Sequence, residues 1–97
     1  MPTFVTLLQW TQKGIENVKE GPSRLDQARE ALKAVGGELK AYYLTLGEYD
    51  GVVISEVPSG KVYTQFILSV GSQGNVRTVT LQAFPEEEYR DIIASLP

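Results

Sequence analysis

The segment Thr3–Trp10, TFVTLLQW, constrains the fold more than any other part of the chain, because it is apolar on both faces of a strand. Alternation places Phe4 and Leu8 on one face, and the opposite face carries Val5. Apolar side chains on both faces must be covered on both faces. We therefore expect Thr3–Trp10 to be an interior strand of a sheet.

A change of period after Trp10 predicts a helix over residues 11–35. Thr11 stands at the N-cap position, and the helix ends at the glycine pair that begins with Gly36. The dipeptide Gly21-Pro22 interrupts the pattern, and Ser23 with Asp26 three residues later is a weak capping-box signal. The sequence therefore predicts a helix with a kink or short break near Gly21.

Two strand-like runs follow, at residues 38–46 and 51–57, and they are joined by the short segment Gly47–Asp50. This arrangement predicts a β-hairpin. The second run carries Val52 and Val53 on opposite faces, so it is also expected to be an interior strand.

Residues 61–70 fit a helical stripe and a strand equally well, and periodicity alone does not decide between them. Topology favours a helix, because a helix here completes a second β-α-β crossover. Residues 76–83 alternate as a fourth strand, and Tyr89, Ile92, Ile93 and Leu96 mark an amphipathic helix after Pro85. The three acids Glu86–Glu88 fit the first turn of that helix, with Glu86 placed to pair with Arg90, better than a metal site.

The predicted order β-α-β-β-α-β-α corresponds to an α+β fold of the ferredoxin-like, split β-α-β type. Its four-stranded antiparallel sheet has the order 4-1-3-2, with right-handed crossovers that place both crossover helices on one face. The two strands that are apolar on both faces fall at the centre of this sheet. Pattern and topology therefore point independently to the same fold, a single domain over residues 1–97.

Composition excludes several classes of function. The chain has 9 basic and 12 acidic residues, a net charge of −3 and no run of Lys or Arg, so we expect no binding to nucleic acid. It has no Cys and no His, which removes thiol nucleophiles, imidazole bases and the usual zinc and haem ligands. We expect no metal and no cofactor. No stretch approaches 18 apolar residues, so we expect no membrane span and a cytoplasmic protein.

Four aromatic residues are candidates for the apolar wall of a ligand cavity between sheet and helices: Trp10, Tyr42, Tyr43 and Phe66. The alternative interpretation is that they are ordinary core and dimer contacts.

Polar candidates lie next to the starts of the third and fourth strands. Tyr49 and Asp50 could orient a polar ligand, although Gly47–Asp50 also fits plain turn chemistry. Arg77 is the only arginine in a predicted strand and could bind a carboxylate, or else guard a sheet edge or pair with Asp50. If a cavity exists, we expect Asp50, Tyr49 and Arg77 at its polar end and Trp10 and Phe66 along its apolar wall.

Three segments resemble the GYD-domain family of small bacterial and archaeal proteins: Gly47–Asp50 after YYLTL, GNVRT at residues 74–78, and LQAF at residues 81–84. The opening TFVTLLQWTQKGI is similar to the start of the family, so the resemblance covers nearly the whole chain. Here Glu48 separates the Gly and Tyr of the literal motif. The resemblance implies ferredoxin-like subunits that pair through their sheets as a dimeric α/β barrel. It implies no defined biochemical role.

We therefore expect a homodimer formed through the sheet face, because both crossover helices cover only one face of a sheet that is apolar on two. We also expect a small organic molecule to bind between sheet and helices of each subunit. The alternatives are a purely structural or regulatory dimerisation module and a cofactor-free oxygenase or isomerase-like enzyme. The histidine-dependent chemistries of this superfamily are excluded, and proton transfer would fall to Asp50, Glu48, Tyr43 or Tyr49.

Overall fold

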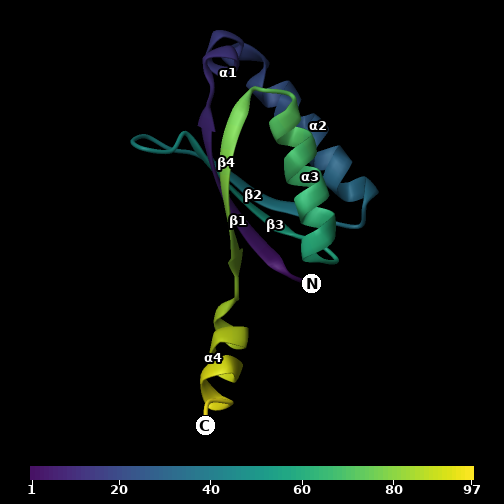
Figure 1. Cartoon of the computed structure of the whole chain (residues 1–97), viewed down its shortest axis with the longest axis vertical. Coiled ribbons are helices and arrows are strands. Elements are labelled where there is room, and N and C mark those ends of the chain that lie inside the picture. Colours follow the sequence, from purple (N-terminus) through teal and green to yellow (C-terminus); the bar gives the residue numbers. More distant parts are fainter.

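The computed structural model describes residues 1–97, and it shows one four-stranded antiparallel sheet with two helices against one face (Figure 1). In chain order the elements are β1 (Thr3–Trp10), α1 (Gln12–Glu16), a 3₁₀ turn (Val18–Glu20), α2 (Gly21–Ala34), β2 (Glu38–Leu44), β3 (Gly51–Glu56), α3 (Gly60–Ser72), β4 (Val76–Ala83) and α4 (Glu86–Ala94). None of the helices combines the length and hydrophobicity that a bilayer crossing requires.

The strand order is β2-β3-β1-β4, and every neighbouring pair is antiparallel. This confirms the predicted ferredoxin-like arrangement, with β1 and β3 at the centre. The helix predicted over residues 61–70 is confirmed as α3. Ser59 caps its first turn, because the Ser59 side chain accepts a hydrogen bond from the Val62 N–H at 3.2 Å.

The first predicted helix is divided near Gly21, as expected, and the break lies at residues 17–20, just before that glycine. Thr11 caps α1 as predicted, accepting the Gly14 N–H at 3.1 Å, and the chain then leaves the helix at Asn17. Gly21 is the first residue of α2 and Ser23 is not its cap, so the expected restart at Ser23 was wrong. The N–H groups in the first turn of a helix have no partner within the helix, so a proline, which lacks this group, is tolerated there. Gly21-Pro22 therefore begins a helix here and does not interrupt one.

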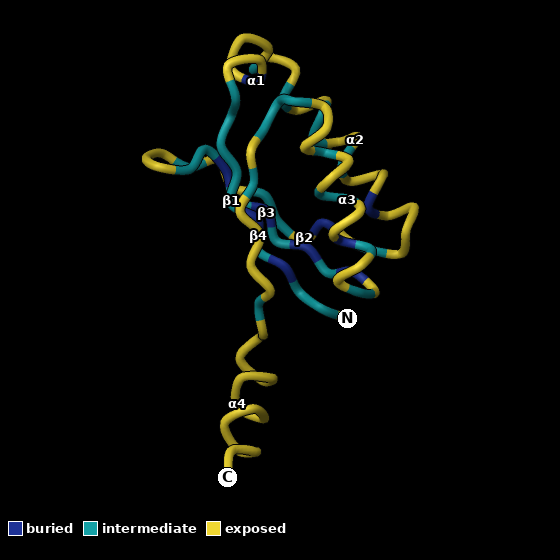
Figure 2. Tube along the Cα trace, viewed as in Figure 1, coloured by how far each residue is buried: buried dark blue, intermediate teal, exposed yellow.

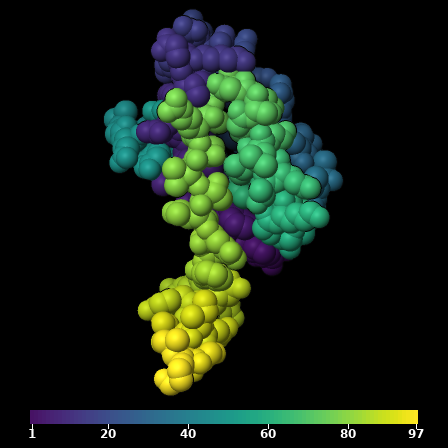
Figure 3. Space-filling view, viewed as in Figure 1, coloured from purple at the N-terminus to yellow at the C-terminus, as the bar shows by residue number.

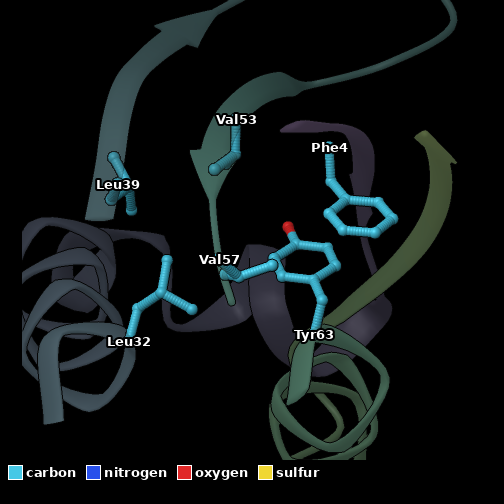
Figure 4. Close-up of a cluster of buried hydrophobic side chains, with 6 residues drawn as sticks. All are labelled: Phe4, Leu32, Leu39, Val53, Val57 and Tyr63. Carbon is cyan, nitrogen blue, oxygen red and sulfur yellow. The ribbon is translucent and has the colours of Figure 1, made fainter. Parts of the chain in front are cut away.

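The buried core lies where α2 and α3 meet the sheet near the start of β1 (Figure 2). Its six apolar residues are Phe4, Leu32, Leu39, Val53, Val57 and Tyr63 (Figure 4). The rings of Phe4 and Tyr63 stack with their centroids 4.7 Å apart. The core therefore anchors both helices to the sheet at this end.

The opposite face of the sheet has no covering layer. In-register neighbours place Val5 beside Ile54 and Leu81, and Leu7 beside Val52 and Val79, on this outer face. Val79 and Leu81 are exposed. The sheet thus presents an apolar band to its surroundings, as the two-faced pattern of β1 and β3 predicts.

The helix α4 extends away from the body of the molecule and covers neither face (Figure 3). It is exposed along its whole length, including Tyr89, Ile92 and Ile93. Glu86 forms the expected ion pair with Arg90 at 2.8 Å within this helix. No group of three or more acidic side chains is placed to hold a metal ion.

Candidate ligand cavity between the sheet and the helices

A cavity of about 630 Å³ lies between the inner face of the sheet and the two helices α2 and α3. The sheet contributes, among others, Thr6, Leu8, Trp10, Tyr42, Val53 and Val76. The helices contribute, among others, Leu25, Ala28, Ala31, Phe66, Ile67 and Val70. Ligand sites in proteins commonly have this size and this mainly apolar lining.

Alternation along β1 explains the lining from the sheet. Thr6, Leu8 and Trp10 share the face of Phe4, so the strand runs from the buried core into the cavity. Two of the α2 residues that line the cavity, Ala28 and Ala31, are small. Two alanines leave the space that larger side chains would fill.

A polar network separates the cavity from the core. The Thr6 hydroxyl lies 2.6 Å from the buried Tyr63 hydroxyl and 3.2 Å from the Thr80 hydroxyl. Beside it, the Tyr63 ring packs against Phe66 with centroids 5.6 Å apart. Because these hydroxyls satisfy one another, the boundary between cavity and core is fixed by hydrogen bonds as well as by packing.

Asp50 joins the hairpin to the end of β1. Its carboxylate Oδ2 accepts the Trp10 N–H at 2.8 Å, and its own N–H donates to the Leu8 carbonyl at 2.8 Å. Since these bonds hold both Leu8 and Trp10, Asp50 positions two residues that line the cavity.

Tyr42 lines the same cavity, and its phenol is close enough to this carboxylate to be affected by its charge. Burial raises the pKa of Tyr42 above its ordinary value of 10.0, and the negative charge of Asp50 raises it further. Its ring lies over Gly51, where an added Cβ would stand 2.9 Å from the phenol oxygen. Glycine at position 51 therefore leaves room for Tyr42, which remains a neutral phenol at ordinary pH.

The structure divides the predicted site residues between two faces. Trp10 and Phe66 both line the cavity, and Asp50 adjoins it through Trp10. Tyr43 pairs with Val52 and Arg77 pairs with Gln9, so both lie on the outer face, and neither lines this cavity.

Tyr49 lies in the loop between β2 and β3, where its carbonyl accepts a hydrogen bond from the Thr45 hydroxyl at 2.5 Å. It does not line the cavity. Asp50 and Arg77 do flank the same end of β1, but the carboxylate bonds the Trp10 backbone and forms no ion pair with Arg77. The five residues expected at one site therefore do not converge there.

Arg24 was not among the predicted site residues, yet it lines the cavity. It lies on α2 four residues before Ala28, on the same side of the helix. The sequence signal that could have identified Arg24 is its position beside the apolar stripe of this helix. This signal is weak, because the stripe itself begins one residue later, at Leu25.

Comparisons with known proteins agree with this architecture. A curated protein of Thermus thermophilus, described as "Glutamine synthetase and cystathionine beta-lyase binding protein", is 34% identical over 97 residues, covering 99% of both chains. The solved structure of FFRP-DM1 has a TM-score of 0.60 at 24% identity and covers 87% of this chain and 100% of its own. The hypothetical protein PHS023 of Pyrococcus horikoshii has a TM-score of 0.56 at 28% identity, covering 88% and 92%.

The family model described as "GYD domain" matches residues 4–93, from the second residue of β1 to the penultimate residue of α4. The match includes the strands and the helices that surround the cavity, and it also includes the segments Gly47–Asp50 and GNVRT. The chain therefore belongs to the GYD-domain family.

Proposed function

We propose that this protein is a homodimeric binding protein that takes up a small organic molecule in the cavity between sheet and helices of each subunit. The observation that carries the proposal is the cavity itself, which is about 630 Å³ in volume and lined mainly by apolar side chains. Apolar surface that remains in contact with water is costly, and an apolar ligand removes that cost on binding.

The only tryptophan of the chain, Trp10, lines the cavity and reports on its occupancy. We expect octanol, a neutral apolar probe, to change the fluorescence of Trp10 saturably. The variant Ala28→Phe fills the cavity from α2 and should abolish the change. The matched variant Ala34→Phe carries the same substitution at an exposed position of the same helix and should bind as the wild type does.

Two results would refute this cavity as the binding site. One is that neither octanol nor octanoate changes Trp10 emission in the wild-type protein. The other is that Ala28→Phe, shown by circular dichroism to be folded, binds the probes as well as the wild type does.

The homodimer rests on the uncovered outer face of the sheet. Val5, Leu7, Val52 and Ile54 form its central band, and a second copy packed sheet against sheet would cover it, burying in total about 1,600 Å² if it is of standard size. Val79→Glu places a charge in this band and should shift the molecular mass in sedimentation equilibrium from two chains to one. Gln65→Glu adds the same charge at an exposed position of α3 and should leave the molecular mass at that of two chains. A mass of one chain for the wild-type protein would refute the dimer.

A second candidate function is the binding of metabolic enzymes. The relative in Thermus thermophilus is described as binding glutamine synthetase and cystathionine β-lyase, and here α4 exposes Tyr89, Ile92 and Ile93 away from the body of the molecule. We would mix the purified chain with each enzyme from its own organism and measure co-sedimentation, with and without residues 85–97. Complex formation that requires α4 supports this function, and its absence with both enzymes opposes it.

A further inference from the structure

Arg24 is the only charged residue among the 24 that line the cavity. Its side chain is only 20% exposed, whereas the charged residues elsewhere on α2 lie in solvent. No carboxylate lines the cavity to balance it. The apolar cavity therefore carries one positive charge on its wall and no negative charge among its lining residues.

The hydrogen-bonding capacity of this guanidinium is largely unused. A guanidinium has five N–H donors, and here Nη1 donates one hydrogen bond, to the Asn17 carbonyl at 3.1 Å. The nearest carboxylate oxygen, Glu20 Oε2, is 3.9 Å away, and the Glu20 side chain is 74% exposed. At that distance it is no hydrogen bond, and solvent screens the ion pair.

The position of Arg24 adds to this imbalance. It lies in the first turn of α2, where the helix dipole disfavours a cation, and Glu20 provides no side-chain cap for that turn. Gly21 and Pro22 of the same turn also line the cavity. An anionic group placed here would interact favourably with both the guanidinium and the helix end.

Building on the proposed function, we propose that the ligand is an amphipathic organic carboxylate, with its aliphatic or aromatic body in the apolar cavity and its carboxylate on Arg24. The planar guanidinium matches a carboxylate through two parallel N–H···O bonds. A phosphate monoester fits less well, because no Lys and no second Arg lines the cavity to balance its second charge.

Octanoate and octanol test the inference, because they share a chain length and differ in charge. In titrations followed by Trp10 fluorescence, the wild-type protein should bind octanoate at least about tenfold more tightly than octanol, the difference expected for hydrogen bonds between charged groups. Arg24→Gln should weaken octanoate binding about tenfold and leave octanol binding unchanged. Arg29→Gln removes a charge from an exposed position of the same helix and should change neither.

The outcomes separate this inference from the proposed function. If the wild type binds both probes equally, or if Arg24→Gln binds octanoate as tightly as the wild type does, the carboxylate is not recognised by Arg24, although the cavity still binds. If neither probe binds, both the cavity and the inference fail. If Arg29→Gln weakens octanoate binding as much as Arg24→Gln does, a general charge effect replaces the specific contact.

Discussion

The two ends of the space between sheet and helices share β1, α2 and α3, yet one end is closed and the other open. At the closed end Leu32 of α2 and Tyr63 of α3 are buried against Phe4. At the open end the cavity is lined by Trp10, which lies on β1 like Phe4, and by the small residue Ala28 of α2. The side chains at the facing positions, rather than the topology, decide whether the layers meet.

The comparison also separates stability from binding within one sheet. A closed end that anchors both helices allows the other end to stay open without loss of the fold. Substitutions at the closed end should therefore lower the free energy of unfolding, and substitutions at the open end should mainly change ligand binding.

The largest effect is expected for Leu32→Ala at the closed end. Leu32 is fully buried, so the variant should lose about 3 kcal/mol of unfolding free energy in urea titrations through lost contacts and a new cavity. Leu25→Ala, the same substitution on the cavity wall, should cost only about 1 kcal/mol. Equal losses in the two variants would show that the ends do not differ in packing.

Gly14→Ala should be next, because it disturbs the rim of the open end. An added Cβ would stand 1.9 Å from the Asn75 carbonyl oxygen, which also accepts the Thr11 N–H at 3.1 Å. We expect a loss of about 2 kcal/mol by urea titration. Gly71→Ala on α3 meets no atom within 4 Å and should not destabilise the protein, and a similar loss in both variants would contradict the close approach.

Ala28→Leu tests whether the open end is empty space. The larger side chain should fill part of the cavity and raise the unfolding free energy of the unliganded protein by about 1 kcal/mol. Ala34→Leu on the exposed side of α2 should leave this free energy almost unchanged. Thermal unfolding of both variants measures the difference. A destabilised Ala28→Leu protein would mean that the space is already filled.

The smallest effect is the pH dependence contributed by Tyr42. Its pKa is raised in the folded protein, chiefly by burial and also by Asp50, so the folded state holds the proton more tightly than the unfolded state. This contribution to stability is full below the ordinary pKa of 10.0 and is lost as the pH rises from that value through the raised pKa of the folded state. The Tyr42→Phe variant should lose less stability than the wild type at alkaline pH, and identical pH profiles would refute the assignment.

Local patterns predicted the sheet well, because each strand carries its own alternation. β1 and β4 have the predicted bounds, and the placement of β1 at the centre follows from its two apolar faces. The helix at 61–70 needed the topology, since its own pattern was ambiguous. The break near Gly21 is confirmed, but the helix restarts at Gly21 and not at Ser23, because Pro22 is tolerated in a first turn.

The candidate site was harder to predict, because it depends on which face each residue takes. An irregularity in β2 between Leu39 and Ala41 shifts the alternation, so Leu39 and Tyr42 both face inward and Tyr43 faces outward. Arg24 was not predicted for another reason. It belongs to the site because it lines the cavity, and the cavity depends on small residues of one element that lie opposite another element. The pattern within a single helix does not show which residues lie opposite it.

The most direct test of the difference between the two ends is a methyl NMR titration of the wild-type protein with octanoate. We expect the largest shift changes at Leu25, Ile67 and Val70, which line the cavity, and little change at Leu32 and Val57 in the core. Changes concentrated on the outer face at Leu7 and Val79, or equal changes at both ends of the helices, would contradict the account.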